Sequence, residues 1–187
     1  MRNIKIKEHL TIDDFKVMMQ LEKMYYNEEF IAPYNEAFKW YQTYPYTVMV
    51  VEDAGQIIGF MNLFPIKNAV VSKIKQGTFN DKYLTTNDIV NIYLPNVSCS
   101  SLFLSCVVIH ENYRKSSALQ LLLKTYATFY SEFEGMRFED VITDNVTSEG
   151  ESFSNKLRFK KVCETDHNSV IYEGSFSDFV EIWKEFK

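Results

Sequence analysis

One stretch, residues 101–130, constrains the fold of this 187-residue chain more than any other. It opens at 102–109 with a mostly apolar run of β-branched and aromatic residues, which predicts a strand buried on both faces. A polar break at 110–117 follows. Apolar residues then recur at helical spacing, at Leu119, Leu122, Leu123, Tyr126 and Tyr130. The stretch therefore predicts a strand, a short loop and an amphipathic helix.

The junction between this loop and helix suits an anion. Ser116 and Ser117 end the loop, and either hydroxyl can cap the helix. A helix start leaves backbone N–H groups free and carries a partial positive charge, which favours a phosphate or another anion. Arg114 and Lys115 lie beside it and add donors and positive charge.

The elements before this stretch follow a simple order. Residues 4–7 alternate as a short strand, Thr11 caps a helix that carries an apolar stripe to Tyr26, and 35–41 form a second helix. Residues 47–52 and 57–66 predict two strands, joined by a turn in which Gly55 is free to take positive φ.

The elements after it are also regular. A strand is expected at 138–145, and a helix follows it with the Ser-x-x-Glu capping pattern at Ser148 and Glu151. Paired strands at 160–164 and 169–173 come next, and Ser177 is expected to cap a last helix over 178–187.

In this order the elements resemble the GNAT superfamily of acyl-CoA-dependent N-acetyltransferases. The family signature is roughly aliphatic-x-Pro-x-aromatic-Arg-Gly-x-Gly-x-Gly before a Leu-rich helix, and Tyr113, Arg114 and the leucines at 121–123 match it. The proline position holds Glu111, and the two glycine positions hold Ser117 and Leu119, so this is a divergent member. The resemblance implies one α/β (α+β) domain over 1–187, with a mixed, mostly antiparallel sheet flanked by helices.

Residues 67–96 are expected to form an insertion between the hairpin and the central strand, because most members of the family cross there by a short turn. Its first part, 67–77, is weakly helical, and 78–96 is polar with scattered apolar residues. Two interpretations stay open. The insertion lies on the acceptor side and tunes specificity, or it is a surface excursion without a role.

The resemblance also implies where acyl-CoA binds. Loop amides hold the CoA pyrophosphate, and the strand pairs with the pantetheine arm. An amide of the strand polarises the thioester carbonyl. Carried onto this chain, the cofactor-binding positions are Val108 or Ile109 for that amide, and Arg114, Lys115, Ser116, Ser117 and Ala118 for the phosphates. The first helices line the acceptor pocket in the family, so Tyr25, Tyr26 and Phe30 are expected to border the substrate.

Amine acylation needs a proton acceptor and, for the thiolate, a proton donor. Asp144, at the end of a strand, is the best-placed carboxylate, although a turn or cap aspartate fits the same position. His110 and Glu111 are the alternatives. Ser154 stands at the position of the family tyrosine that protonates the thiolate. Cys106 has no evident basic neighbour in the sequence and is expected to pack in the core.

Composition excludes several other classes. A net charge of −5 argues against a general nucleic-acid-binding surface. Three cysteines without CxxC spacing and three scattered histidines predict reduced thiols and no metal site. The sequence shows no signal core and no membrane-length apolar span, so a cytoplasmic protein is expected. A homodimer stays open.

Three functional hypotheses follow. The first is an N-acetyltransferase that moves an acetyl group from acetyl-CoA to a primary amine of a small molecule or peptide, by direct attack in a ternary complex. The second is a catalytically inactive GNAT-fold sensor or interaction module, motivated by the lost glycines and tyrosine. The third is an unrelated α+β binding domain, which predicts no opening between the strands at 102–109 and 138–145.

Overall fold

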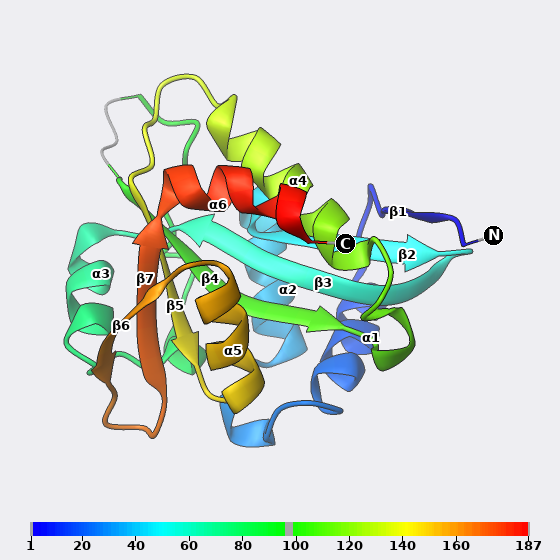
Figure 1. Cartoon of the computed structure of the whole chain (residues 1–187), viewed down its shortest axis with the longest axis horizontal. Helices are drawn as coiled ribbons and strands as arrows, with labels where there is room; N and C mark the ends of the chain where they lie inside the picture. The colour runs from blue at the N-terminus through cyan, green and yellow to red at the C-terminus, as the bar shows by residue number, and fades with distance from the viewer. Residues whose placement is uncertain (1, 96–98, 187) are drawn as a thin grey trace.

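The computed structural model describes residues 2–95 and 99–186. They form a seven-stranded sheet in the order β1-β2-β3-β4-β5-β7-β6 (Figure 1). Among the described strands, only β4 and β5 pair in parallel. The strands are β1 (Ile4–Ile6), β2 (Val48–Asp53), β3 (Gln56–Pro65), β4 (Ser101–Ile109), β5 (Asp140–Asn145), β6 (Lys160–Glu164) and β7 (Val170–Ser175).

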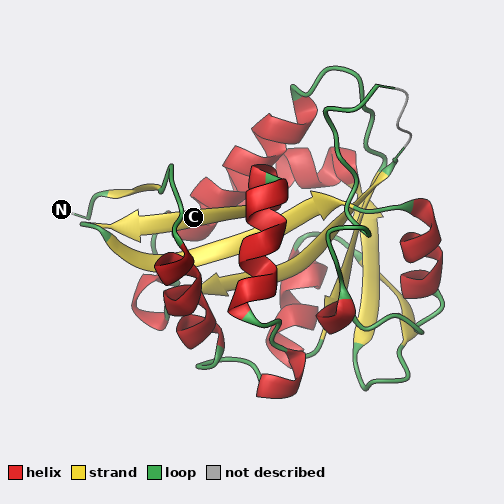
Figure 2. Cartoon of the chain, turned by 180° about the vertical axis from the view of Figure 1, so that it is seen from behind, coloured by secondary structure: helices red, strands yellow, loops and turns green. Residues whose placement is uncertain are grey.

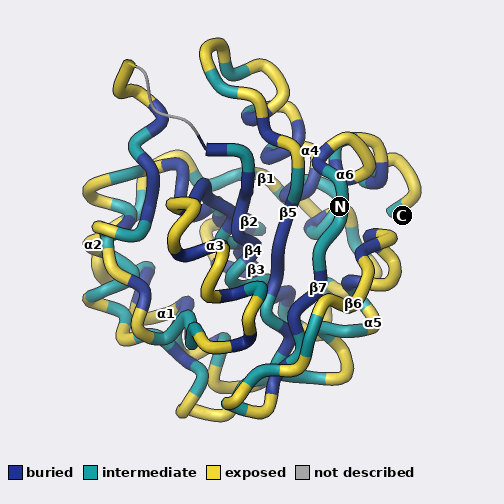
Figure 3. Tube along the Cα trace, turned by 90° about the vertical axis from the view of Figure 1, so that its left-hand side faces the viewer, coloured by how far each residue is buried: buried dark blue, intermediate teal, exposed yellow. Residues whose placement is uncertain are grey.

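Helices cover both faces of the sheet. They are α1 (Ile12–Glu22), α2 (Tyr34–Thr43), α3 (Asn68–Lys75), α4 (Ala118–Ser131), α5 (Ser148–Lys156) and α6 (Phe176–Ile182), with 3-10 turns η1 (Glu28–Phe30), η2 (Pro45–Thr47), η3 (Asp81–Tyr83), η4 (Glu111–Tyr113) and η5 (Trp183–Glu185). Figure 3 shows α1, α2 and α3 on one side of the buried strands and α4, α5 and α6 on the other. Figure 2 shows α2 crossing the first of these faces.

An irregularity between β3 and β4 shapes the centre of the sheet. Asn62 pairs with Cys106, but the next pair is Leu63 with Leu104, so Ser105 is an extra residue in β4. A β-bulge of this kind leaves backbone groups unpaired and bends the strand.

The buried tyrosines of α4 hydrogen-bond to the backbone of β3 near the end of its pairing with β2. The Tyr126 hydroxyl donates to the Met61 carbonyl at 3.0 Å and accepts from the Leu63 N–H at 3.3 Å. The Tyr130 hydroxyl donates to the Leu63 carbonyl at 2.8 Å. Because a buried backbone group without a partner costs free energy, these two hydroxyls stabilise β3 on the edge where its pairing with β2 ends.

β4 and β5 separate directly after the bulge. Their parallel pairing runs from Ser101 with Asp140 to Leu104 with Thr143, whereas β4 continues to Ile109. Among the described residues, the later half of β4, residues 105–109, therefore has no strand partner on its β5 side. The hypothesis of an unrelated binding domain predicted no such opening, and the structure contradicts it.

The described part of the expected insertion, residues 67–95, packs buried side chains into the core rather than forming a surface excursion. Val70 and Ile74 of α3 are buried against the sheet, and so are Leu84 and Ile89 farther along. Ile89 also forms a β-bridge with Ile66. The last residue of the expected insertion, Asn96, lies outside the described residues.

Most predicted elements are present, and some boundaries are corrected. Thr11 caps α1 as expected, with a reciprocal bond to Asp14. The cap of α5 is Thr147 rather than Ser148, and its hydroxyl accepts from the Gly150 N–H at 3.0 Å. Ser175 caps α6 rather than Ser177, so that helix starts at Phe176 and ends at Ile182. β5 starts at Asp140 rather than at residue 138.

Candidate functional site

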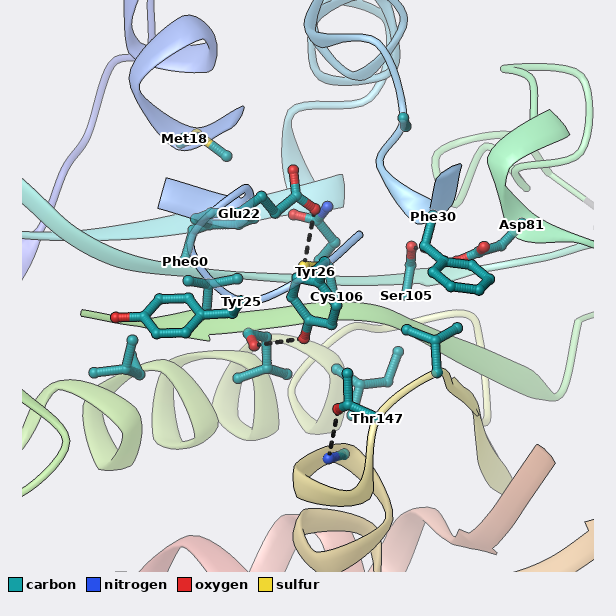
Figure 4. Close-up of a pocket in the computed structure, with 18 of the residues that line it drawn as sticks. Met18, Glu22, Tyr25, Tyr26, Phe30, Phe60, Asp81, Ser105, Cys106 and Thr147 are labelled. Atoms are coloured by element: carbon teal, nitrogen blue, oxygen red, sulfur yellow. Dashed lines mark hydrogen bonds between the residues drawn. The ribbon is translucent and has the colours of Figure 1, made fainter. Parts of the chain in front are cut away.

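A cavity of about 660 Å³ opens where β4 and β5 separate. Its walls come from α1, η1, α2, η3, the later half of β4, the end of β5 and the start of α5 (Figure 4). Tyr25, Tyr26 and Phe30, which the sequence placed beside the substrate, all line it. The expected insertion contributes Asp81 and Lys82.

The backbone of β4 presents polar groups along the opening. The His110 N–H donates to the Ile58 carbonyl of β3 at 2.8 Å. In an antiparallel pair the residues alternate between facing the partner and facing away. The N–H of Val108 is therefore directed to β3, and those of Val107 and Ile109 face the open edge. Of the two residues predicted to present an amide there, Ile109 has this geometry and Val108 does not.

The loop before α4 keeps donors available. The Ser116 hydroxyl accepts from the Ala118 N–H at 3.2 Å, while Ser117 holds the N-cap position without a side-chain capping bond. Among the described residues, the N–H groups of Leu119 and Gln120 have no acceptor. These two groups form the free positive end of α4.

Arg114 and Lys115 are exposed beside this helix end. The Arg114 guanidinium carbon lies 4.7 Å from the centre of the Tyr25 ring. The Tyr25 hydroxyl in turn accepts from the Glu111 N–H at 2.9 Å. Arg114 lines the cavity, but the predicted binding positions from Lys115 to Ala118 lie outside its wall.

Glu22, at the end of α1, lines the cavity and faces β4. The Cys106 thiol donates to its carboxylate at 3.2 Å (Figure 4). Burial is the main cause that raises the pKa of Glu22 to about 7; the Cys106 bond acts in the opposite direction, and the charge of the nearby Asp81 contributes a smaller rise. Glu22 can thus take up or release a proton near neutral pH.

Asp81, from η3, lies beside Glu22 on the same wall. It accepts from the Ser105 hydroxyl at 3.2 Å. Burial raises the pKa of Asp81 to about 7, and the charge of Asp144 adds to the rise. Neither Glu22 nor Asp81 forms an ion pair with any described residue.

Asp144, the predicted proton acceptor, lies at the end of β5 with a side chain only 3% exposed. One carboxylate oxygen lies 3.0 Å from His167 Nε2, and His167 Nδ1 lies 2.9 Å from Asp166. Burial lowers the pKa of His167, but its bonds to these two carboxylates outweigh burial and raise it. His110, the alternative base, instead caps η4 by accepting from the Asn112 N–H.

Three buried polar atoms of residues on the cavity wall lack a hydrogen-bond partner among the described residues. They are Oδ1 of Asp144, Oδ1 of Asn62 and Nε1 of Trp40. A buried polar atom without a partner is costly, and such atoms at a cavity indicate a partner supplied from outside the chain.

Ser154, the predicted proton donor, is fully buried. Its hydroxyl accepts from the Asn145 side-chain amide at 2.8 Å, and the residue is not part of the cavity wall. We therefore do not propose Ser154 as the proton donor.

Sequence reasoning missed Glu22 and Asp81. A signal for Glu22 was present, because it occupies a position of the apolar stripe that includes Phe15 and Met18 on the first helix. A carboxylate on the buried stripe of a helix needs an explanation. Asp81 gave no such signal, since it sits in a polar stretch.

The comparisons with known proteins support the fold. No protein-family model and no curated protein sequence matches the chain. Among solved structures, Ard1 from Thermoplasma volcanium is 12% identical, with a TM-score of 0.62 over 92% of this chain and 97% of that one. The GphF GNAT-like decarboxylase with isobutyryl-CoA is 14% identical, with a TM-score of 0.65 over 92% and 99%. The NatC complex bound to Gag peptide and CoA is 9% identical, with a TM-score of 0.58 over 91% and 95%.

These likenesses and the strand order show that the chain has the GNAT fold, and they confirm the predicted fold class. No helix in the described part of the chain is long and apolar enough to cross a bilayer. Within residues 2–95 and 99–186, no group of three or more potential ligand side chains could hold a metal ion.

Proposed function

We propose that the protein is an N-acetyltransferase that moves an acetyl group from acetyl-CoA to a primary amine of a small molecule or peptide, by direct attack in a ternary complex. One observation carries this proposal. The unpartnered edge of β4 opens onto a cavity in which the Glu22 carboxylate, with a pKa of about 7, faces the same strand. Structural neighbours solved with isobutyryl-CoA or with CoA and a peptide are consistent with it.

The chain offers a continuous set of donors for the cofactor. The N–H groups of Val107 and Ile109 suit the extended pantetheine arm, and one of them polarises the thioester carbonyl. The free N–H groups at the start of α4 suit the diphosphate. The Arg114 guanidinium carbon lies 4.7 Å from the centre of the Tyr25 ring, and its N–H groups are suited to phosphate oxygens.

The cavity supplies the proton transfers. A primary amine arrives protonated and must lose that proton before nitrogen attacks the thioester carbon. Glu22 is the carboxylate suited to accept it near neutral pH. Asp144 is a second candidate for the proton acceptor, because its bond to His167 holds the carboxylate in place. As the carbon–sulfur bond breaks, we assign protonation of the thiolate to Tyr26, whose hydroxyl lies 3.2 Å from the Val107 carbonyl at the open edge.

Isothermal titration with acetyl-CoA tests the cofactor assignment. We expect saturable binding that Arg114→Glu abolishes, while Arg137→Glu, the same charge change at another exposed arginine, leaves it intact. Glu22→Gln should lower the rate of CoA release at least about 100-fold, the lower range for a lost general base, with the acetyl-CoA Kd unchanged. Absence of heat at millimolar acetyl-CoA would refute the proposal.

A non-catalytic acyl-CoA sensor is the second candidate. It is favoured by Ser154, which is buried outside the cavity where the family has a tyrosine, and by Ser117 and Leu119 at the glycine positions. Acetyl-CoA binding without CoA release for any amine in a broad panel would identify the sensor.

A further inference from the structure

We propose that the acceptor is an aliphatic diamine or polyamine, a flexible chain with at least two ammonium groups. This inference rests on the proposed function and adds the substrate class. It is drawn from the carboxylates of the cavity, from its unpartnered acceptor atoms and from its aromatic walls.

The carboxylates come first. Glu22 and Asp81 line one cavity, and neither forms an ion pair with a described residue; His167, whose charge acts on Asp81, is bonded to Asp144 and Asp166 instead. A charge held away from bulk water normally has a counter-ion, because removing an ion from water costs several kcal/mol. Lys82 also lines the cavity but forms no ion pair with either carboxylate. In this proposal the counter-ions of Glu22 and Asp81 are the ammonium groups of a bound ligand.

The bulge in β4 sets the spacing of these carboxylates. Asp81 is bonded to Ser105 and Glu22 to Cys106, which are consecutive residues. In a regular strand consecutive side chains point to opposite faces, whereas the extra residue of a bulge re-aims a side chain. Figure 4 shows both bonded pairs along one side of β4. One short chain can therefore reach both carboxylates.

The unpartnered atoms are an independent sign of a donor-rich ligand. Oδ1 of Asp144, whose side chain is 3% exposed, and Oδ1 of Asn62 are acceptors without a donor. An ammonium group brings three N–H donors and no acceptor, so it satisfies such atoms. His167 occupies the other oxygen of Asp144. Asp144 thus keeps one oxygen available for a ligand.

The remaining walls suit the carbon chain. Tyr26, Phe30, Tyr34 and Phe60 line the cavity. Aromatic faces accept both methylene groups and cations, and a cation over such a ring gains about 0.5–2 kcal/mol. An acceptor that carries a carboxylate, such as a free amino acid, would bring a negative charge towards Glu22 and Asp81. Repulsion between these like charges disfavours its binding.

The geometry assigns a different task to each end of the acceptor. The reacting ammonium gives one proton to the Glu22 carboxylate, and the neutral nitrogen then forms the bond to the acyl carbon. As the carbon–sulfur bond breaks, Tyr26 protonates the thiolate, so CoA leaves as the thiol, and the second proton lost by the nitrogen restores the Tyr26 hydroxyl. The distal ammonium stays charged between Asp81 and Asp144. A monoamine of the same length has no second ammonium group to bind between Asp81 and Asp144.

Turnover with matched amines tests this division. Release of CoA from acetyl-CoA is measured with 1,4-diaminobutane, 1-aminobutane and 4-aminobutanoate. We expect kcat/KM for the diamine to exceed that for the monoamine at least about tenfold, equivalent to about 1.4 kcal/mol. Asp81→Asn should remove this preference, whereas Asp13→Asn, at an exposed aspartate, should keep it. Equal kcat/KM for the three amines would overturn the inference.

Titration of the diamine without acetyl-CoA separates this inference from the proposed function. Saturable heat with the wild type that is lost in Asp81→Asn supports the diamine site even if no acyl-CoA binds. Circular dichroism confirms that the variant is folded. If diamines give no heat while monoamines or peptides are acetylated, the substrate class is wrong and the acetyltransferase stands.

Discussion

The strongest physical test of the cavity is the dependence of stability on pH. Folding raises the pKa of Glu22 from its ordinary value of 4.5 to about 7. Each pKa unit corresponds to about 1.36 kcal/mol, so holding the charged carboxylate in the folded protein costs about 3 kcal/mol. Glu22 is only partly buried, so solvent screens its charge and about 3 kcal/mol is an upper bound.

The sign and the pH window follow from linkage. Because the folded pKa lies above the unfolded one, the folded state binds the proton more tightly. Below pH 4.5 Glu22 is protonated in both states, and its ionisation does not affect stability. Between about pH 4.5 and 7 the unfolded state ionises first, and stability falls. Above pH 7 the full cost is present. Glu22→Gln removes this cost and keeps an acceptor for the Cys106 thiol.

We therefore expect the variant to gain stability over the wild type as pH rises from 4.5 to 8.5, by up to about 3 kcal/mol. Urea unfolding followed by circular dichroism at several pH values measures the difference. The control is Glu139→Gln, the same substitution at an exposed glutamate. If the wild-type and Glu22→Gln free energies keep a constant difference across this range, the carboxylate is not desolvated and our account of the cavity is wrong.

Three further predictions test other parts of the structure. Tyr126→Phe leaves two buried backbone groups of β3 unsatisfied, so urea unfolding should show a loss of about 1–3 kcal/mol. In Gly59→Ala the added Cβ would lie 2.6 Å from the Val108 carbonyl oxygen, so β4 must shift and isothermal titration should show weaker acetyl-CoA binding. Tyr26→Phe removes the assigned proton donor, so steady-state assays should show a lower kcat for CoA release, with the fold unchanged by circular dichroism.

The backbone frame was predictable because its signals are local. The apolar run before the polar break is β4, and the leucines and tyrosines after it form the buried face of α4. Thr11 caps α1, and this was also predictable, because two acidic residues follow it within the first turn of the helix. Such patterns depend only on neighbours a few residues away, so a single sequence reveals them.

Helix boundaries show how competing local signals mislead. Ser148 and Glu151 match a capping box, yet Thr147 takes the cap because its backbone is extended there. Ser175 likewise begins α6 two residues before Ser177, directly at the end of β7. Adjacent serines and threonines offer equivalent hydroxyls. The position at which the preceding strand ends determines which hydroxyl caps the helix.

The chemistry of the cavity was not predictable from the sequence, because its contacts join distant segments. Glu22 meets Cys106 across 84 residues, and Asp81 meets Ser105 across 24. The sequence shows no basic neighbour for Cys106 and predicts that this residue packs in the core. Glu22 is that neighbour, but burial also raises the pKa of the Cys106 thiol. The cysteine therefore donates to Glu22 and stays protonated, which makes it a positioning group rather than a nucleophile.

The bulge at Ser105 links these features. One extra residue bends β4 away from β5, which exposes the edge that suits an acyl-CoA arm. The same residue bonds Asp81 beside the Glu22–Cys106 pair, at the point where Asp81 and Lys82 line the cavity. A regular β4 could continue its pairing with β5 beyond Thr143 and would place the side chains of residues 105 and 106 on opposite faces. The edge and the paired carboxylates therefore arise from the same bulged residue, and a change that restored regular pairing would remove both together.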